Sequence, residues 1–171
     1  MMIRKNLCAS PALAVLLSMM VPNMHVAAQT ATLKEQLVGT WAYVSVDTVR
    51  PDGARQPMYG NNPQGLAVFD ASGHYILMTS RADIAKFASG NRTDGTPEEN
   101  KAVVQGMIAH FGTYSVNESE QTITFHIATS SFPNWNGVEQ KRPFSISGEQ
   151  LKWATPGSSG GTAEVILRRL R

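Results

Sequence analysis

One arginine in a strand-like segment stands among apolar residues, where its chemistry suits the recognition of a small molecule. Side chains alternate between the two faces of a strand, so Arg142 shares a face with Phe144. The same face carries Val138, Gln140 and Ile146. An arginine on an apolar face requires an acceptor, and it can hold a carboxylate or carbonyl through charge-assisted hydrogen bonds. The alternatives are an internal ion pair, or an edge position or bulge at Pro143 that turns the arginine outward.

Two residues of neighbouring strand-like segments could act together with this arginine. His126 shares a face with Thr122 and Thr124. If the threonine face lines a cavity, His126 could orient a ligand or transfer a proton, because its unperturbed pKa is about 6.5. If that face is outside, His126 is a surface histidine. Tyr114 is a similar candidate, since it combines an apolar ring with one hydroxyl.

A short loop after the segment of His126 concentrates aromatic side chains. Phe132, Asn134 and Trp135 surround Pro133, which stiffens the backbone. They either rim the mouth of a cavity or form a structural loop whose tryptophan covers the core. The predicted ligand-binding set is therefore Tyr114, His126, Phe132, Asn134, Trp135, Gln140 and Arg142.

Other kinds of site find little support in the sequence. His74, His110 and His126 lack the close spacing of metal ligands, so we predict no metal and no cofactor. The segment 157–161 matches the letters of a nucleophile elbow at Ser159, but a strand follows it where that motif needs a helix. A turn is the better interpretation, and no catalytic residue is predicted.

The N-terminal segment has the pattern of a secretory signal peptide. Arg4 and Lys5 precede a mostly apolar run over residues 7–21, and Val26-Ala27-Ala28 supplies small residues for cleavage. The run is short for a membrane span and is interrupted by polar residues and proline, so a retained anchor is the less favoured alternative. We expect cleavage near Ala28, one domain over residues 29–171, and a secreted or periplasmic location.

Removal of residues 1–28 leaves a neutral domain without cysteine. Arg4 and Lys5 account for the formal net charge of +2, and Cys8 is the single cysteine. A neutral domain without basic runs argues against nucleic acid as a partner and against a membrane partner after cleavage. Without disulfides, the domain depends on its core for stability. The sequence does not define the oligomeric state.

Short runs of β-branched and aromatic residues, separated by turn residues, predict a mainly β fold. Eight antiparallel strands can close into an up-and-down barrel, which removes exposed edges and leaves an interior that holds side chains or one small ligand. The predicted strands are residues 41–49, 65–70, 74–80, 112–116, 122–129, 138–146, 150–154 and 162–170.

One α-helix is predicted between the third and fourth of these strands. Thr96 and Glu99 form a capping box, with Pro97 at the first helical position. Apolar residues follow at helical spacing and predict a face that packs on the sheet or covers a barrel end. The loop over residues 81–95 is long enough to act as a lid. The apolar residues of the predicted face are Val104, Met107, Ile108 and Phe111.

The first strand opens with Leu37-Val38-Gly39-Thr40-Trp41. Its glycine allows a close backbone approach, and its indole can plug one end of a barrel. The guanidinium of Arg168 or Arg169 in the last strand could stack on Trp41 where the barrel closes.

Several segments of the chain form a recognisable set. They are residues 37–41, 65–66, 73–75, 87–90, 95–99, 112–114 and 132–135, followed by Gly137, Gln140 and Arg142. Together they resemble the bacterial lipocalin-like domain proteins of the calycin type, over nearly all of residues 29–171. The resemblance implies an eight-stranded barrel with a ligand cavity, and little about chemistry. Lys141 and Pro143 depart from the pattern, because an unbroken strand richer in arginine is usual there.

These observations support three hypotheses of different classes. The first is an exported barrel that binds one small, largely apolar or amphipathic molecule with a polar or anionic end. The alternative is a cofactor-independent isomerase or cyclase in the same cavity, with His126 or Tyr114 moving a proton and Arg142 stabilising an oxyanion. The third is a structural or interaction domain with a filled interior. The first two require an open cavity lined by these three side chains.

Overall fold

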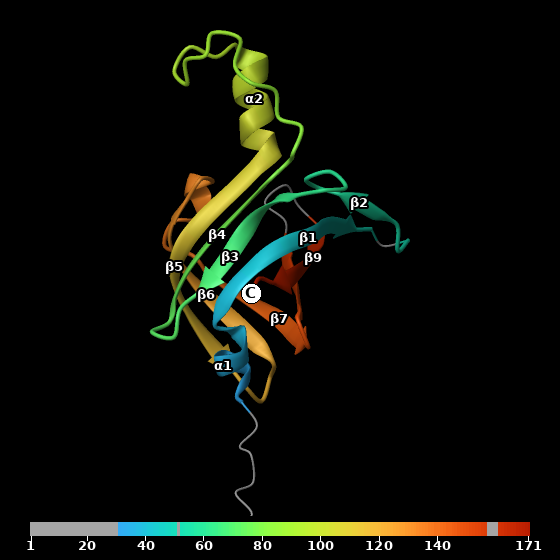
Figure 1. Ribbon diagram of the computed structural model, residues 1–171, viewed down its shortest axis with the longest axis vertical. Helices are drawn as coiled ribbons and strands as arrows, with labels where there is room; N and C mark the ends of the chain where they lie inside the picture. Colours follow the sequence, from blue (N-terminus) through green and yellow to red (C-terminus); the bar gives the residue numbers. More distant parts are fainter. Residues whose placement is uncertain (1–30, 51, 157–160) are drawn as a thin grey trace, which may run out of the picture. The chain divides into compact units, whose positions relative to one another are not determined.

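The strands of the chain form one antiparallel sheet that closes on itself (Figure 1). A computed structural model describes residues 31–171 with the exception of residue 51 and residues 157–160. The signal peptide predicted for residues 1–28 and the excluded nucleophile Ser159 lie outside the described residues.

Eight strands make the closed barrel, which confirms the predicted fold class. They follow one another around the barrel in chain order, and the last strand pairs with the first. The short β2 pairs with the end of β1 and is not needed for closure. The strands are β1 (Gly39–Val49), β2 (Arg55–Pro57), β3 (Gln64–Phe69), β4 (His74–Ser80), β5 (Met107–Asn117), β6 (Thr122–Ser130), β7 (Glu139–Ser147), β8 (Gln150–Pro156) and β9 (Thr162–Arg169).

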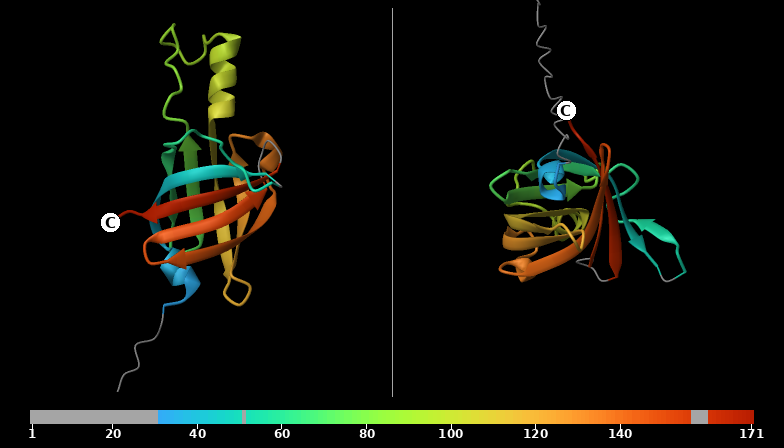
Figure 2. Two further views of the ribbon diagram at one scale, coloured as in Figure 1. Left: turned by 90° about the vertical axis from the view of Figure 1, so that its right-hand side faces the viewer. Right: turned by 90° about the horizontal axis from the view of Figure 1, so that it is seen from below.

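Two α-helices lie at opposite ends of the barrel (Figures 1 and 2). The helix α1 (Leu33–Leu37) begins with a capping box of Thr32 and Glu35. The helix α2 (Pro97–Gly106) and the loop before it project beyond the other end. A 3-10 turn, η1 (Pro133–Trp135), connects β6 and β7. The helix α1 and the strand β2 were not predicted, because elements of five and three residues carry too little periodicity.

The predicted helix begins where the sequence places it but ends earlier. The Thr96 side chain accepts a hydrogen bond from the Glu99 backbone, and the Thr96 backbone donates to the Glu99 carboxylate, so the capping box is confirmed. The prediction that Met107, Ile108 and Phe111 form a helical face is wrong, because these residues belong to β5. Pairing with β4 from Met107 onward satisfies their backbone groups in the sheet.

The barrel closes between β1 and β9, where Trp41 pairs with Arg169. The Arg169 guanidinium lies over the Trp41 ring at 4.1 Å from its centroid, which confirms the predicted stacking with a last-strand arginine. The Trp41 indole donates to the Leu37 carbonyl at 2.8 Å. Gly39 has a φ of 134°, and a Cβ there would lie 2.8 Å from Arg169 Nη1, so this glycine permits the close approach.

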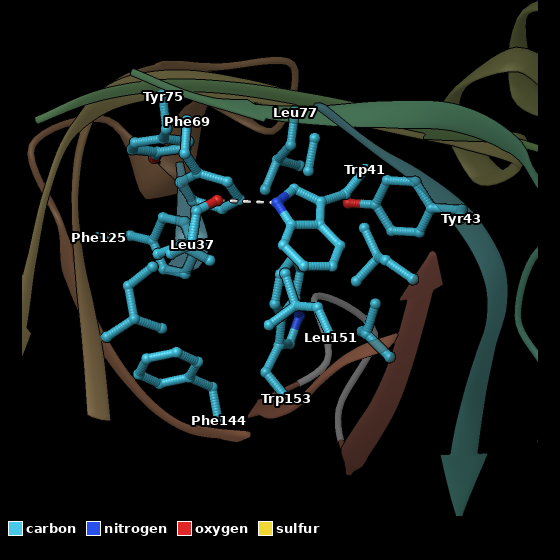
Figure 3. Packing of buried hydrophobic residues seen from close by; sticks show 14 of the residues in the cluster. Leu37, Trp41, Tyr43, Phe69, Tyr75, Leu77, Phe125, Phe144, Leu151 and Trp153 are labelled. Carbon is cyan, nitrogen blue, oxygen red and sulfur yellow. Dashed lines mark hydrogen bonds between the residues drawn. The ribbon is translucent and has the colours of Figure 1, made fainter. Parts of the chain in front are cut away.

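Aromatic and aliphatic side chains fill much of the interior (Figure 3). Phe69 and Phe125 lie at its centre, and both contact the rings of Tyr75 and Trp153. The inner side chains of β6 are Ile123, Phe125 and Ile127, so the threonines of this strand face outward. The half of the barrel near α1 is therefore packed core, and the space for a ligand lies toward α2.

The structure resolves the direction of Arg142 on β7. Pro143 is exposed, and the pairing of β7 with β8 runs from Phe144 to Ser147, so the proline lies just beyond that ladder. No register shift interrupts the pairing of β7 with β6 at this point. The proline consequently leaves the alternation intact, and Arg142 points into the barrel with 3% of its surface exposed.

Candidate ligand-binding site

Two adjoining hollows open the barrel at its α2 end. The inner cavity holds about 50 Å³ among side chains of the barrel wall. The outer cleft holds about 640 Å³ and lies between β2, the end of α2 and the start of β5. Met58, Tyr59 and Ile108 line both hollows, so they form the boundary between cleft and cavity.

Arg142 is the charged group of the inner cavity. β7 presents it inward, and its guanidinium lies over the Phe125 ring at 4.4 Å and near the Trp153 ring at 5.9 Å. One terminal nitrogen, Nη2, donates to the Gln140 side-chain carbonyl. Its Nε has no hydrogen-bond partner among the described residues. Burial lowers the pKa of Arg142, because the charged form is poorly solvated there.

No carboxylate compensates this charge in the described part of the chain. The ion pairs formed there involve other arginines, lysine and histidines. The lining of the inner cavity contains no aspartate or glutamate among these residues. The alternative that Arg142 forms an internal ion pair is therefore not found among the described residues. A buried guanidinium without a counter-ion favours an acceptor or an anion from outside the chain.

Two further polar groups at the cavity lack partners within the described residues. They are the Thr79 hydroxyl and the Trp153 indole N–H, and both residues line the cavity with Arg142. The indole and Arg142 Nε can only donate, while the hydroxyl can donate or accept. Buried donors cost free energy until they are bonded, so the cavity that these residues line is suited to a ligand that supplies acceptors.

A neutral histidine borders the same cavity. His110 Nδ1 lies 2.8 Å from the Tyr75 hydroxyl, and its ring packs edge-on against Trp135 at 5.8 Å. Burial, together with the nearby charge of Arg142, lowers the pKa of His110 to about 3. His110 is therefore uncharged at neutral pH and adds a polar group without a charge.

Sequence reasoning missed His110 because the predicted helix covered its position. The signal that could have found it is the alternation of Ile108, His110 and Tyr114, which marks one face of a strand. In β5 the side chains of His110 and Tyr114 are buried, and those of Phe111 and Thr113 are exposed. The cavity residues Tyr43, Tyr59, Thr79 and Trp153 were also not predicted, because their proximity depends on closure of the barrel.

Four of the seven predicted residues come together around the hollows. Trp135 lines the inner cavity, and Phe132 lines the outer cleft. Their rings contact each other edge-on at 5.7 Å, and η1 holds both near the mouth. Gln140 is half-buried and reaches the site through its hydrogen bond with Arg142. Asn134 is exposed on η1 and lines neither hollow.

The expectation that His126 lines the cavity is corrected by the structure. His126 points outward from β6, with 40% of its side chain exposed, and its Nδ1 lies 2.7 Å from Glu139. The physical reason is that Phe125 and its neighbours on the opposite face fill the interior with apolar surface. His126 is a surface histidine beside a carboxylate.

Tyr114 lies inside the barrel but not at the cavity. Its ring contacts Phe69 edge-on at 5.2 Å, and its hydroxyl donates to the Asp70 carbonyl at 2.7 Å. This hydrogen bond ties β5 to the turn after β3, and the residue does not line either hollow. The expectation of a cavity tyrosine at this position is corrected to a core residue with a satisfied hydroxyl.

The loop over residues 81–95 and α2 form an internally bonded arm beside the outer cleft. The Ala88 backbone donates to Glu99 at 2.8 Å, and Asn100 donates to the Gly95 carbonyl at 3.0 Å. Val104 is 77% exposed, so the first of the two predicted roles, packing on the sheet, is wrong for this helix. It contributes Val103 and Val104 to the wall of the cleft.

No cluster of three or more histidine, cysteine, aspartate or glutamate side chains in the described ranges could hold a metal ion. Within the same ranges, no helix has the length and apolar character needed to cross a membrane.

The barrel and its interior cavity define a lipocalin-like protein, and comparison with known families agrees. The lipocalin-like domain family matches residues 38–165, so the chain belongs to this family. The match confirms the resemblance seen in the sequence. A comparison with curated proteins found no match to the chain.

Several solved structures are similar to this chain at low sequence identity. A lipocalin-like protein from Bacteroides uniformis is 14% identical, with a TM-score of 0.43 over 78% of this chain and 98% of that chain. An uncharacterised protein from Bacteroides eggerthii is 13% identical, with a TM-score of 0.42 over 78% of this chain and 99% of that chain. A redesigned β-barrel is 16% identical, with a TM-score of 0.42 over 84% of this chain and all of the design.

Proposed function

We propose that this protein binds one small, largely apolar molecule whose polar or anionic end enters the inner cavity. The observation that carries the proposal is the buried Arg142, which has an unpaired Nε and no carboxylate partner among the described residues. An apolar route leads to it, since Met58 and Ile108 line both hollows. Concave sites with mostly apolar walls and a few convergent polar groups are typical of small-molecule binding.

The two hollows suit different parts of such a ligand. The inner cavity of about 50 Å³ has room for about one or two water molecules or one small polar group. The outer cleft of about 640 Å³ falls in the size range of pockets that hold small organic ligands. Met107 and Phe132 supply apolar surface there. We propose that the polar end lies at Arg142 and the apolar body lies in the cleft.

The structure favours binding over the predicted isomerase or cyclase chemistry. That alternative assigned proton transfer to His126 or Tyr114, and neither side chain lines the cavity. His110 does line it, but its pKa of about 3 makes it a weak base at neutral pH. The hypothesis of a filled interior is disfavoured by the cavity at Arg142.

Native mass spectrometry of the protein isolated from its own source tests the proposal. We expect a retained small molecule, which extraction and chemical identification would show to be mostly apolar with one acceptor group. Replacement of the cavity arginine in the variant Arg142→Met should abolish retention. A protein that retains nothing and shows no tryptophan fluorescence change with amphipathic probes would contradict the proposal, because Trp135 and Trp153 line the cavity.

We also propose that the protein is exported, on the basis of the signal-like pattern in residues 1–28. Expression of the full chain, followed by cell fractionation and mass measurement, tests this. The expected product lies outside the cytoplasm and begins near Gln29. A full-length chain that stays in the cytoplasm or the inner membrane would contradict it.

A further inference from the structure

We infer that the inner cavity selects a singly charged anion of carboxylate size, and that Gln140 sets this preference by leaving the charge of Arg142 uncompensated. The inference rests on the proposed function and narrows it to one class of ligand.

The charges along the route into the barrel leave one cation without a partner. Among the described residues that line the two hollows, the charged side chains are Arg81 and Arg142. Arg81 forms an ion pair with Asp83 at 2.7 Å. Arg142 forms no ion pair in the described part of the protein, and 3% of its surface is exposed to solvent. One negative charge from a ligand would therefore balance the site.

Gln140 occupies the position from which the chain could have supplied that charge itself. It lies two residues before Arg142 on the same face of β7, and its side-chain carbonyl accepts the hydrogen bond from Nη2. A glutamate would place a carboxylate on the same nitrogen and form an internal ion pair. The glutamine instead bonds the guanidinium without neutralising it, and Nε is left as a buried donor without a partner among the described residues.

The size and donor groups of the cavity favour a carboxylate over a larger or more highly charged group. The inner volume of about 50 Å³ matches about one or two water molecules, which is close to the size of one carboxylate group. Arg142 Nε, Trp153 Nε1 and the Thr79 hydroxyl belong to residues of the cavity lining and have no hydrogen-bond partner among the described residues, so the lining favours a ligand with acceptor oxygens. A phosphate monoester is bulkier and carries up to two charges, of which a single guanidinium balances one.

A matched set of three ligands tests the charge preference directly. Decanoate, 1-decanol and decyl phosphate share one apolar chain and differ in the charge of the polar end. Each is titrated at pH 8 into protein produced from the full chain, with calorimetry and tryptophan fluorescence as readouts. We expect decanoate to bind about 10- to 100-fold more tightly than the alcohol, the range for hydrogen bonds to a charged group. Decyl phosphate should bind more weakly than decanoate.

Variants at position 140 separate the role of charge from that of packing. Gln140→Glu should lower decanoate affinity about 10- to 100-fold and erase the difference from decanol, because the internal carboxylate neutralises Arg142. Gln140→Leu should keep the decanoate preference, because it adds no charge. Gln64→Glu is the matched control, since Gln64 is exposed on β3 and its charge change should leave all three affinities unaltered.

The outcomes distinguish failure of the inferred carboxylate preference from failure of the proposed small-molecule binding. Equal binding of decanoate and decanol, tighter binding of decyl phosphate, or an unchanged preference in Gln140→Glu overturns the inference and leaves the proposed function standing. If Gln140→Glu does not fold, loss of the preference in Gln140→Leu overturns it instead. Failure of the wild-type protein to bind any of the three, together with no retained molecule, refutes both.

Discussion

Replacement of Arg169 by methionine should show how much the β1–β9 closure contributes to stability. Methionine keeps an unbranched apolar side chain and removes the guanidinium. The variant Arg169→Met loses the stacking on Trp41 at 4.1 Å and the hydrogen bond from Nη1 to the Val38 carbonyl at 2.8 Å. It also loses the hydrogen bond from Nη2 to the Gln36 carbonyl. The two carbonyls lie at the end of α1, where a cation interacts favourably with the helix terminus.

The expected cost follows from these contacts. Stacking of a cation on tryptophan contributes about 1 kcal/mol when partly exposed. Hydrogen bonds from a charged group contribute about 1.5–3 kcal/mol each when buried, but Arg169 is half-buried and water can replace part of this. We therefore expect a loss of about 2–4 kcal/mol in the free energy of unfolding. For a domain of this size, the corresponding fall in Tm is about 6–14 °C.

Arg168 provides the matched control, because it is the exposed neighbour of Arg169 on β9. Urea unfolding and calorimetry of Arg168→Met should give a change within about 0.5 kcal/mol of the wild-type value. Similar losses in the two variants would refute the reasoning, because they would show that the closure depends on general charge and not on the stacked guanidinium.

Three further predictions concern the site and the arm. Arg142→Met should leave the free energy of unfolding unchanged or raise it in urea titrations, because an apolar side chain removes an uncompensated buried charge; a loss above about 1 kcal/mol would contradict this. Unfolded His110 takes up its proton near pH 6.5 and folded His110 near pH 3, so stability should fall by about 1.4 kcal/mol per unit as the pH drops through this window. Comparison of urea midpoints at pH 7 and pH 5 tests this, and His110→Gln should show a smaller fall; equal falls would argue against a buried neutral histidine. Thr96→Ala should increase the rate of amide exchange in α2 by about 5- to 10-fold, because the helix loses its cap. The urea midpoint of barrel unfolding should not change, since the buried residue of α2 is Gly106 at its end. Unchanged exchange would show that the arm is held by other contacts.

Local patterns predicted most of the barrel because strand alternation reports directly on burial. The alternation placed Arg142 and Phe144 on one apolar face but left an outward turn at Pro143 open, and the structure buries both side chains. The capping box of Thr96 and Glu99 likewise fixed the start of α2, since a cap involves neighbouring residues. These features depend on interactions within a few residues.

The errors arose where two local patterns competed or where both faces of a strand were plausible. Residues 104–111 fit helical spacing, but cross-strand hydrogen bonding with β4 decided that β5 begins at Met107. On β6 the hypothesis that the threonine face lines the cavity placed His126 inside the barrel. The interior there is filled by Phe125 and the rings around it, so the apolar face turned inward.

The sequence by itself determined a barrel of alternating strands, the family to which the chain belongs and an arginine on the apolar face of one strand, while the structure decided that this face points inward at Arg142. Only the tertiary structure decided that Arg142 lacks a carboxylate partner among the described residues, and that Thr79, His110 and Trp153 share its cavity. The physical reason is that β4, β5, β7 and β8 contribute these side chains, and they become neighbours only when the sheet closes between β1 and β9. A site built from side chains of several strands cannot be read from the pattern of any one strand.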